Sequence, residues 1–317
     1  MKLSVVVPCY NEEENIHLIY ETILHDFSHC DFDYEIVFVN DGSKDNTYTE
    51  LKKLLAFEQP IKIVNFSRNF GKESAMYAGL KESSGDYVAI IDADLQQRPA
   101  LVLDMVRMLD DEPEYDCVAA YQENRSEGKF ISFCKDIFYK FINRFSDTEF
   151  VKGASDFRVF SRKMAQSVID ADEYFRFSKG LFSWVGYNTK FIPYIADERA
   201  NGTSKWSFPK LVAYALDGIF AFTTAPLKIP TFIGLLSVLV SVIYLIAVII
   251  HNSVSSFYVV TYQPVLFAVL FIGGLQLTAM GIAGEYLART YIQTKNRPIY
   301  IAKEVVTNKK EGNNING

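Results

Sequence analysis

Short apolar runs rich in β-branched residues alternate with helix-length segments through the first two-thirds of the chain. The runs that predict strands cover residues 3–8, 34–40, 61–67, 87–92, 116–120 and 189–195. Helices are predicted between them, including an aromatic-rich helix over residues 130–144. Strands and helices that alternate through short loops form βαβ units, so the pattern predicts an α/β fold with a mostly parallel sheet.

The hydrophobic pattern changes after residue 206. Apolar residues recur at helical spacing and predict an amphipathic helix, through Phe208, Leu211, Val212, Ala215, Leu216, Ile219 and Phe220. This helix could pack as an ordinary core helix. Because it directly precedes a predicted membrane span, we favour a position in the bilayer interface.

Two long segments, residues 229–250 and 264–284, contain no charged residue. Each is roughly the length that a transmembrane helix requires. The connection between them has no Lys or Arg, whereas cationic residues flank the outer ends of the pair: Lys205, Lys210, Lys228, Arg289, Lys295 and Arg297. The positive-inside rule then predicts a multi-pass protein of the inner or plasma membrane with both termini in the cytoplasm.

These patterns predict four regions. They are a cytoplasmic domain at residues 1–206, a juxtamembrane interfacial helix at 207–228, a two-helix transmembrane region at 229–288 and a cytoplasmic tail at 289–317. No secretory signal opens the chain, because the apolar run at 3–7 is too short for one. The first domain is therefore expected to stay on the cytoplasmic side.

Composition narrows the choice of function. The chain is 49% hydrophobic, and its net charge of −6 argues against a general nucleic-acid-binding protein. The four cysteines lie far apart with no C-x-x-C pair, which predicts reduced thiols rather than a zinc site or a disulfide framework.

The strongest candidate chemistry follows the strand at residues 87–92, where Asp92 and Asp94 are two positions apart. Ligands of open α/β sheets bind at the carboxyl ends of the strands. Two neighbouring carboxylates repel each other, and a bound Mg²⁺ or Mn²⁺ would relieve that repulsion. The alternative is an ordinary solvated loop.

Polar residues also follow the other strands. No G-x-G-x-x-G or G-x-x-x-x-G-K-[ST] motif follows the first strand, so neither a dinucleotide fingerprint nor a Walker A loop is predicted. Asn11 is a candidate helix N-cap, and Asp45 a candidate cap for the next helix. Asp156, just ahead of a further apolar strand, is either a turn or cap residue or part of a site. The segment 197–206, with Gly202 among hydroxyls and cations, is either a loop able to close over phosphates or a linker.

Taken in order, five segments carry a family resemblance: Val-Pro-Cys-Tyr-Asn-Glu-Glu at 7–13, Asn-Asp-Gly-Ser at 40–43, Ser-Arg-Asn-Phe-Gly-Lys at 67–72, Asp-Ala-Asp-Leu-Gln at 92–96 and Arg-Ala-Asn-Gly-Thr-Ser-Lys-Trp at 199–206. With the two spans, they resemble the polyprenyl-phosphate glycosyltransferases of family 2. These enzymes have the GT-A fold and include dolichyl-phosphate mannose synthase and the bactoprenol glucosyltransferases. The resemblance covers nearly the whole chain.

The resemblance implies roles for particular residues. The nucleotide-sugar would be bound by Pro8, Tyr10, Glu12, Asp41, Arg68, Lys72 and Asp92. The cation, Mg²⁺ or Mn²⁺, would be held with the diphosphate by Asp92, Asp94 and Gln96. Asp94 and Asp156 would be the catalytic residues, with Asp156 near the acceptor, where it would orient the acceptor or weakly accept a proton. A loop closing on lipid phosphate or diphosphate would contain Arg125, Arg199, Ser204 and Lys205.

Two positions depart from the family pattern. Asn40 stands where the family often has a first Asp, so one nucleoside contact would lose a charge. Gln97-Arg98-Pro99 stands where Asp-Pro-Pro is common, which puts a metal role for position 97 in doubt.

The implied activity is inverting, metal-dependent transfer of a hexose from a UDP-sugar, with UDP-glucose or UDP-N-acetylglucosamine favoured, to undecaprenyl or another polyprenyl phosphate. The resemblance also implies a homo-oligomer, a tetramer, with the bilayer as a partner. One alternative is a membrane-tethered nucleotide-sugar sensor or scaffold without turnover. Another is a polysaccharide synthase, although the chain lacks the Gln-x-x-Arg-Trp motif and the additional spans of that class.

Overall fold

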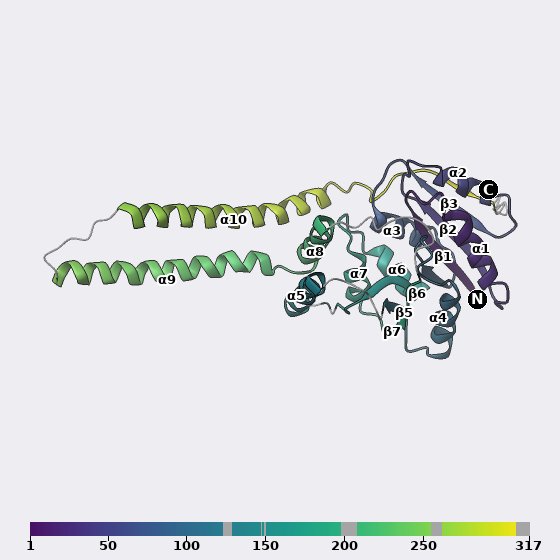
Figure 1. The fold of residues 1–317 in the computed structure, drawn as a ribbon, viewed down its shortest axis with the longest axis horizontal. Helices are drawn as coiled ribbons and strands as arrows, with labels where there is room; N and C mark the ends of the chain where they lie inside the picture. The colour runs from purple at the N-terminus through teal and green to yellow at the C-terminus, as the bar shows by residue number, and fades with distance from the viewer. Residues whose placement is uncertain (123–128, 147, 149, 198–207, 255–261, 309–317) are drawn as a thin grey trace, which may run out of the picture. The chain divides into compact units, whose positions relative to one another are not determined.

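The computed structural model of the protein describes residues 1–122, 129–146, 148, 150–197, 208–254 and 262–308 (Figure 1). The chain forms two compact units. The first contains Met1–Gly218 together with Arg297–Gly317, and the second contains Ile219–Asn296.

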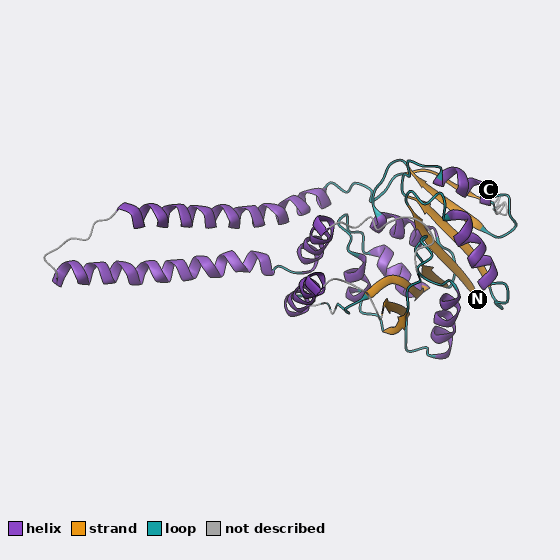
Figure 2. Cartoon of the chain, in the orientation of Figure 1, coloured by secondary structure: helices purple, strands orange, loops and turns teal. Residues whose placement is uncertain are grey.

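The first unit is built on one sheet of eight strands in the order β7-β5-β6-β4-β1-β2-β3-β8 (Figure 2). The strands are β1 Lys2–Cys9, β2 Asp33–Asn40, β3 Ile61–Phe66, β4 Tyr87–Ile90, β5 Cys117–Gln122, β6 Ala154–Ser161, β7 Thr189–Tyr194 and β8 Ala302–Thr307. β1 pairs in parallel with β2 and β4, β2 with β3, and β5 with β7. Only β6 and β8 run antiparallel to their neighbours. The predicted mostly parallel α/β sheet is confirmed.

Helices cover both faces of this sheet. The helices that precede residue 223 are α1 Ile16–Asp26, α2 Thr47–Leu54, α3 Lys72–Glu82, α4 Ala100–Asp111, α5 Lys129–Phe145, α6 Arg162–Asp170, α7 Ser178–Trp184 and α8 Phe208–Phe222, and six of them pack on the sheet. Residues of α1, α2 and α4 share one hydrophobic cluster with alternate residues of β1, and residues of α3, α6 and α7 share the other.

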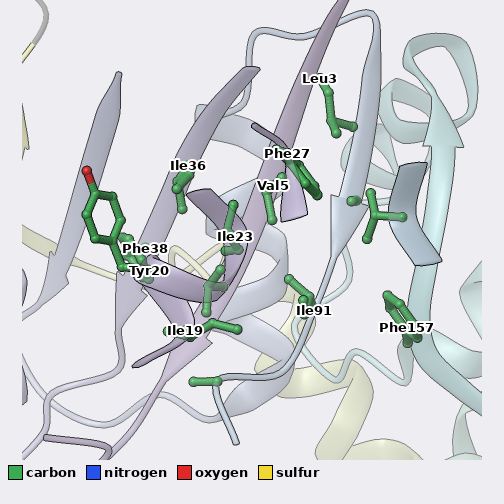
Figure 3. Close-up of a cluster of buried hydrophobic side chains, with 14 of the residues drawn as sticks. Leu3, Val5, Ile19, Tyr20, Ile23, Phe27, Ile36, Phe38, Ile91 and Phe157 are labelled. Carbon is green, nitrogen blue, oxygen red and sulfur yellow. The ribbon is translucent and has the colours of Figure 1, made fainter. Parts of the chain in front are cut away.

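Alternation along β1 explains the two clusters. Leu3 and Val5 point into the first cluster, where Figure 3 shows them near residues of α1, whereas Val6 belongs to the second. A strand covered on both faces is apolar at successive positions, which is why this run does not alternate with polar residues. Complete burial of side chains such as Ile23 and Phe38 contributes about 1.5–3 kcal/mol each.

Two predictions about helices need correction, one at a helix start and one at a break between two helices. Asn11 is not the N-cap of α1, because that position is occupied by Asn15. Asn11 instead has a φ of 52°, in the left-handed region that Asn tolerates better than most residues. The predicted single helix at 207–228 is interrupted after α8, where the hydroxyl of Thr223 accepts a hydrogen bond from the Ala225 N–H.

The C-terminal region contains a strand that the sequence analysis missed. Residues 289–317 were predicted to be a tail, yet β8 pairs antiparallel with β3 at the edge of the sheet. Tyr300 stacks on Phe66 with ring centroids 4.8 Å apart. Asn308 accepts a hydrogen bond from the Ile61 N–H and donates to the carbonyl of Gln59. The last residues described therefore complete the first unit.

The second unit contains helices α9 Ala225–Val254 and α10 Tyr262–Thr294, which lie alongside each other (Figure 1). The Tyr286 hydroxyl of α10 donates to the Thr223 carbonyl at 2.5 Å. Among the residues that the structure describes, one segment, Ala225–Tyr244, is long and apolar enough to cross a membrane. The second predicted span lies within α10, and its passage through a membrane stays a prediction.

Replacing Asn308 by alanine tests the contribution of the C-terminal strand. Asn308→Ala removes the hydrogen bonds to Ile61 and Gln59 and a third, 2.8 Å long, to the Phe57 carbonyl. We expect a loss of about 1–3 kcal/mol of stability, seen as a lower midpoint of thermal unfolding in detergent. The control is Lys303→Ala, at an exposed position of β8. Equal midpoints for the Asn308 variant and the parent would contradict a stabilising role.

Candidate active site

The loops that follow β1 and β2 are fastened to each other. The Asn11 N–H donates to the Ser43 hydroxyl at 2.9 Å, and the Asn11 side chain accepts from the Lys44 N–H at 2.8 Å. The Glu12 N–H donates to the Thr47 hydroxyl at 2.8 Å. These contacts hold one wall at the carboxyl ends of the strands. The predicted nucleotide-binding residues of this wall, Pro8, Tyr10 and Glu12, are all half-buried.

Asp41 fastens the loop after β2 to the loop after β3. Its carboxylate accepts hydrogen bonds from the N–H groups of Phe70 and Gly71 and from the Asn69 amide. Burial raises the pKa of Asp41 to about 6, although the N–H donors favour its ionised form. Asp41 therefore supports the loop that leads into α3, a role that the resemblance did not imply.

Gly42, beside Asp41, permits this close approach of the two loops. Its φ is +60°, and a Cβ built there would lie 2.3 Å from the backbone carbon of Arg68. The Arg68 side chain is exposed, and its guanidinium stacks 3.9 Å from the centre of the Phe70 ring.

Asn40, the first departure from the family pattern, has a structural role as an amide. Its side chain is 2% exposed and donates a 2.8 Å hydrogen bond to Asn65 on the neighbouring strand. It also accepts from the Ser43 N–H. The amide is thus part of the packing between β2 and β3.

Lys72 brings two predicted site carboxylates together. It is the first residue of α3, and its ammonium lies 2.7 Å from Asp92 and 2.9 Å from Asp156. β6 runs antiparallel to β4 with Ile90 opposite Arg158. Continuing that register by two residues sets Asp156 opposite Asp92. The interpretation of Asp156 as a turn or cap residue is wrong, because Asp156 lies within β6.

The charges of this group stabilise each other. The Lys72 side chain is 42% exposed, yet protein atoms surround its ammonium end. Burial lowers the pKa of Lys72, but Asp156 and Asp92 outweigh burial and raise it above its usual range. Burial raises the pKa of Asp156, and the opposing effects of Lys72, Lys179 and Arg158 hold it well below its usual range. Lys72 and Asp156 are therefore both charged at neutral pH.

Gln97, the second departure from the family pattern, holds the other side of Asp92. Gln97 is 4% exposed. Its carbonyl accepts from the Asp92 N–H at 2.9 Å, and its NH₂ donates to the Asp92 carboxylate at 3.1 Å. Gln97 thus fixes both the backbone and the carboxylate of Asp92, a role that the sequence analysis missed.

Asp94 and Gln96 lie on the turn that follows. Asp94 is half-buried, and its carboxylate accepts from the Gln96 N–H at 3.3 Å. The Gln96 carbonyl accepts from the Asp197 N–H, and the Gln96 side chain donates to the Asp197 carbonyl at 3.4 Å. Arg98 completes the contact through two hydrogen bonds, of 2.6 and 2.8 Å, to the Asp197 carboxylate.

The donor set fits a hard cation only if a substrate contributes ligands. Within the described ranges, no cluster of three or more His, Cys, Asp or Glu side chains could hold a metal ion. Asp92 and Asp94 supply carboxylate oxygens from one turn. Mg²⁺ is commonly bound by one or two carboxylates together with substrate phosphates. These two residues therefore suit a cation that arrives with a phosphorylated ligand.

Glu73 is a further, half-buried acid that the sequence analysis missed. It follows Lys72, and its carboxylate accepts hydrogen bonds from the N–H and the hydroxyl of Ser178. Burial and the nearby Asp156 carboxylate raise the pKa of Glu73 to about 7. The spacing of Glu73 and Ser178 in the sequence gives no sign of this contact. The predicted loop residues Arg125, Arg199, Ser204 and Lys205 lie outside the described residues.

The sequence model of Glycosyl transferase family 2 matches residues 4–169. A putative glycosyltransferase of Bacillus subtilis (strain 168) is 41% identical over 303 residues, covering 95% of this chain and 91% of that protein. A prophage bactoprenol glucosyl transferase homolog of Escherichia coli (strain K12) is 38% identical, covering 96% and 99%. The crystal structure of glucosyl-3-phosphoglycerate synthase from Mycobacterium tuberculosis is similar over 69% of this chain and 77% of that chain, with 20% identity and a TM-score of 0.46.

The chain belongs to glycosyl transferase family 2 and has a GT-A-like α/β fold. It is a glycosyltransferase. The family resemblance and the enzyme class predicted from the motifs are thereby confirmed. The roles of individual site residues stay predictions.

Gln97 offers a test of how Asp92 is held. Gln97→Glu keeps an acceptor for the Asp92 N–H but sets a second carboxylate against the Asp92 side chain. We expect sugar transfer to fall about 10- to 100-fold, as is common when a partner of a site carboxylate is replaced. The rate is measured with purified protein at saturating donor. The control, Gln166→Glu, lies on α6, where the Gln166 side chain donates to the Asp170 carboxylate. Unchanged transfer by the Gln97 variant would contradict the positioning role.

Proposed function

We propose that this glycosyltransferase moves a hexose from a UDP-sugar to the phosphate of a polyprenyl phosphate such as undecaprenyl phosphate, with inversion at the anomeric carbon. The observation that carries the proposal is the Lys72–Asp92–Asp156 group at the carboxyl ends of the strands. Its mixed charges suit a reaction between phosphorylated molecules. Relatives named bactoprenol glucosyl transferases support the acceptor class. UDP-glucose and UDP-N-acetylglucosamine are the favoured donors.

Binding of the donor would use the loops after β1 and β3 and the turn after β4. Pro8, Tyr10 and Glu12 would contact the nucleoside, and exposed Arg68 would reach its phosphates. Asp92 and Asp94, with Gln96, would hold Mg²⁺ or Mn²⁺ together with the diphosphate. Such a cation supplies positive charge that stabilises the leaving diphosphate. Lys72 adds a second positive charge beside Asp92.

Asp156 suits an orienting role better than a basic one. Its pKa is held below the usual range by Lys72 and Lys179 against the effect of burial, so it accepts a proton poorly at neutral pH. A phosphomonoester has a second pKa near 6 and is already largely ionised at pH 7. The acceptor therefore needs little help from a base. The Asp156 Oδ1 atom is buried without a hydrogen-bond partner in the described protein, so it is suited to accept one from a substrate hydroxyl.

A membrane location follows from the acceptor, because a polyprenyl chain stays in the bilayer. The apolar segment Ala225–Tyr244 supports an anchor. We extend this to a second span in α10, an interfacial α8, cytoplasmic termini and a homotetramer. The flanking cations favour this topology through the positive-inside rule. Lys228 lies on the exposed surface of α9, where it could attract anionic headgroups.

A donor and acceptor panel tests the proposed function. Purified full-length protein in detergent is given labelled UDP- and GDP-sugars and undecaprenyl phosphate, with Mg²⁺, Mn²⁺ or a chelator. We expect a lipid-linked monosaccharide from a UDP-sugar, and none with the chelator. Cation-dependent UDP binding without product would instead favour a sensor. A polymeric product would favour a polysaccharide synthase.

Two aspartate variants separate the proposed roles. We expect Asp94→Asn to lower transfer by at least ~10²-fold because the cation site loses charge. Asp156→Asn should keep measurable turnover, because an orienting residue can be replaced in part by an amide. Asp110→Asn, which alters an exposed partner of Tyr87, is the control. Parent-like transfer by Asp94→Asn in the lipid-product assay would remove the cation hypothesis.

A further inference from the structure

Leu95 has an unusual backbone conformation, on the turn between Asp94 and Gln96. Its φ is 59°, in the left-handed region that bulky side chains rarely adopt. The Leu95 side chain packs against the first hydrophobic cluster, and this packing holds the middle of the turn. A strained residue persists only where its surroundings hold it in place, and such residues are concentrated at functional sites. The turn therefore needs support from other segments as well.

Asp197, the third residue after β7, supplies such support. Its N–H donates to the Gln96 carbonyl at 3.2 Å, and its carbonyl accepts from the Gln96 side-chain NH₂ at 3.4 Å. The Asp197 carboxylate accepts from Arg98 Nε at 2.6 Å and from Arg98 Nη2 at 2.8 Å. Asp197 thus bonds both residue 96 and residue 98, from a segment 99 positions further along the chain than Arg98.

The Arg98–Asp197 ion pair provides position rather than much stability. The Arg98 side chain is 73% exposed and that of Asp197 is 38% exposed. Solvent weakens the attraction between charges at such exposure. The paired hydrogen bonds still give geometric specificity, because a planar guanidinium fits a carboxylate in a defined orientation. A precise contact at an exposed place indicates a requirement of the neighbouring site.

That neighbouring site is the one suited to a divalent cation. The Asp94 carboxylate accepts from the Gln96 N–H at 3.3 Å, so the conformation of Leu95 between them affects where the carboxylate lies. The bond from the Gln96 NH₂ to Asp197 also orients the amide, whose carbonyl oxygen is a ligand type that Mg²⁺ and Mn²⁺ accept. Both residues therefore depend on how the turn is held.

We propose that Arg98 and Asp197 are positioning residues for the cation. Their ion pair holds Leu95 in its left-handed conformation, and this places Asp94 and Gln96 for one divalent cation. The inference rests on the proposed function, which supplies the cation and the diphosphate that accompanies it. Arg98 stands where the family often has proline, so this support belongs to the particular sequence of this chain.

Equilibrium binding of Mn²⁺ to full-length protein in detergent, with UDP present, tests Arg98→Gln and Asp197→Asn. We expect both variants to bind Mn²⁺ about 10-fold or more weakly than the parent, as is common when a partner of a site ligand is lost. A direct effect of charge predicts opposite signs, because removing a positive charge tightens cation binding and removing a negative one weakens it. Tighter or parent-like binding by Arg98→Gln would overturn the proposal.

Arg107→Gln is the matched control. Arg107 is also exposed and pairs with Asp104 at 3.6 Å within α4, so the variant loses the same charge at a position away from the turn. We expect it to bind Mn²⁺ like the parent. Binding weakened equally by Arg107→Gln and Arg98→Gln would refute a specific role for Arg98.

The double variant of Arg98 and Asp197 separates a shared role from two independent ones. It should bind Mn²⁺ no more weakly than the weaker single variant, because the two residues act through one contact. The midpoint of thermal unfolding should stay near that of the parent, since the pair is exposed. Additive losses would refute the shared role. Weaker binding that accompanies a large fall in the midpoint would show general loss of structure and refute positioning.

Leu95→Asn tests the part played by the backbone. Asn adopts the left-handed conformation more readily than Leu, so the turn should depend less on the ion pair. Arg98→Gln should then weaken Mn²⁺ binding less in the Leu95→Asn background than in the parent. Comparison within each background removes the effect of the lost Leu95 packing. An equal loss in both backgrounds would refute the role of Leu95.

Failure of the proposed function can be distinguished from failure of this inference. A parent that transfers no sugar but binds Mn²⁺ in the presence of UDP refutes the function, and the variants then decide the inference by binding alone. A parent that binds no Mn²⁺ in the presence of UDP overturns the inference, whatever its transfer activity.

Discussion

The Lys72 ammonium lies between the carboxylates of Asp92 and Asp156, and the candidate site is arranged around this contact. Three separate segments meet there: the end of β4, the start of α3 and the antiparallel strand β6. Removing Lys72 would leave both carboxylates, of which Asp156 is the less exposed, without the positive charge that compensates them, which costs more than the pair contributes. The arrangement therefore depends on each segment being held by its own supports, and the structure supplies them in Asp41, Gln97 and Glu73.

Much of the first unit could be predicted from the sequence because its strands are short, apolar and separated by helices. All seven strands that precede α8 were expected, and the run of polar residues after them marked the correct edge of the sheet. Asp92 was a candidate for the same reason, since the carboxyl ends of parallel strands converge, and Lys72 was a candidate through the family resemblance. The long apolar helix α9 was equally clear from the sequence, because an uncharged run of that length is typical of a membrane span.

Contacts between distant segments could not be predicted. Gln97 looked like a loss of a metal ligand, whereas its amide bonds both the backbone and the carboxylate of Asp92. Asp41 was expected to bind the nucleoside, which stays a prediction, and nothing in the sequence indicated that its carboxylate accepts backbone N–H groups of the next loop. Asn11 was misassigned because Asn favours both helix caps and left-handed turns, and only the neighbouring loop decides between them.

The C-terminal strand has a consequence for how the molecule is made. β8 follows both long helices in the chain, yet it pairs with β3 at the edge of the sheet. During synthesis on the ribosome, the edge of β3 that pairs with β8 therefore stays unpaired until both long helices have been synthesised. An unpaired edge strand readily pairs with other chains. The sheet of the catalytic domain can therefore be completed only after both long helices have been synthesised.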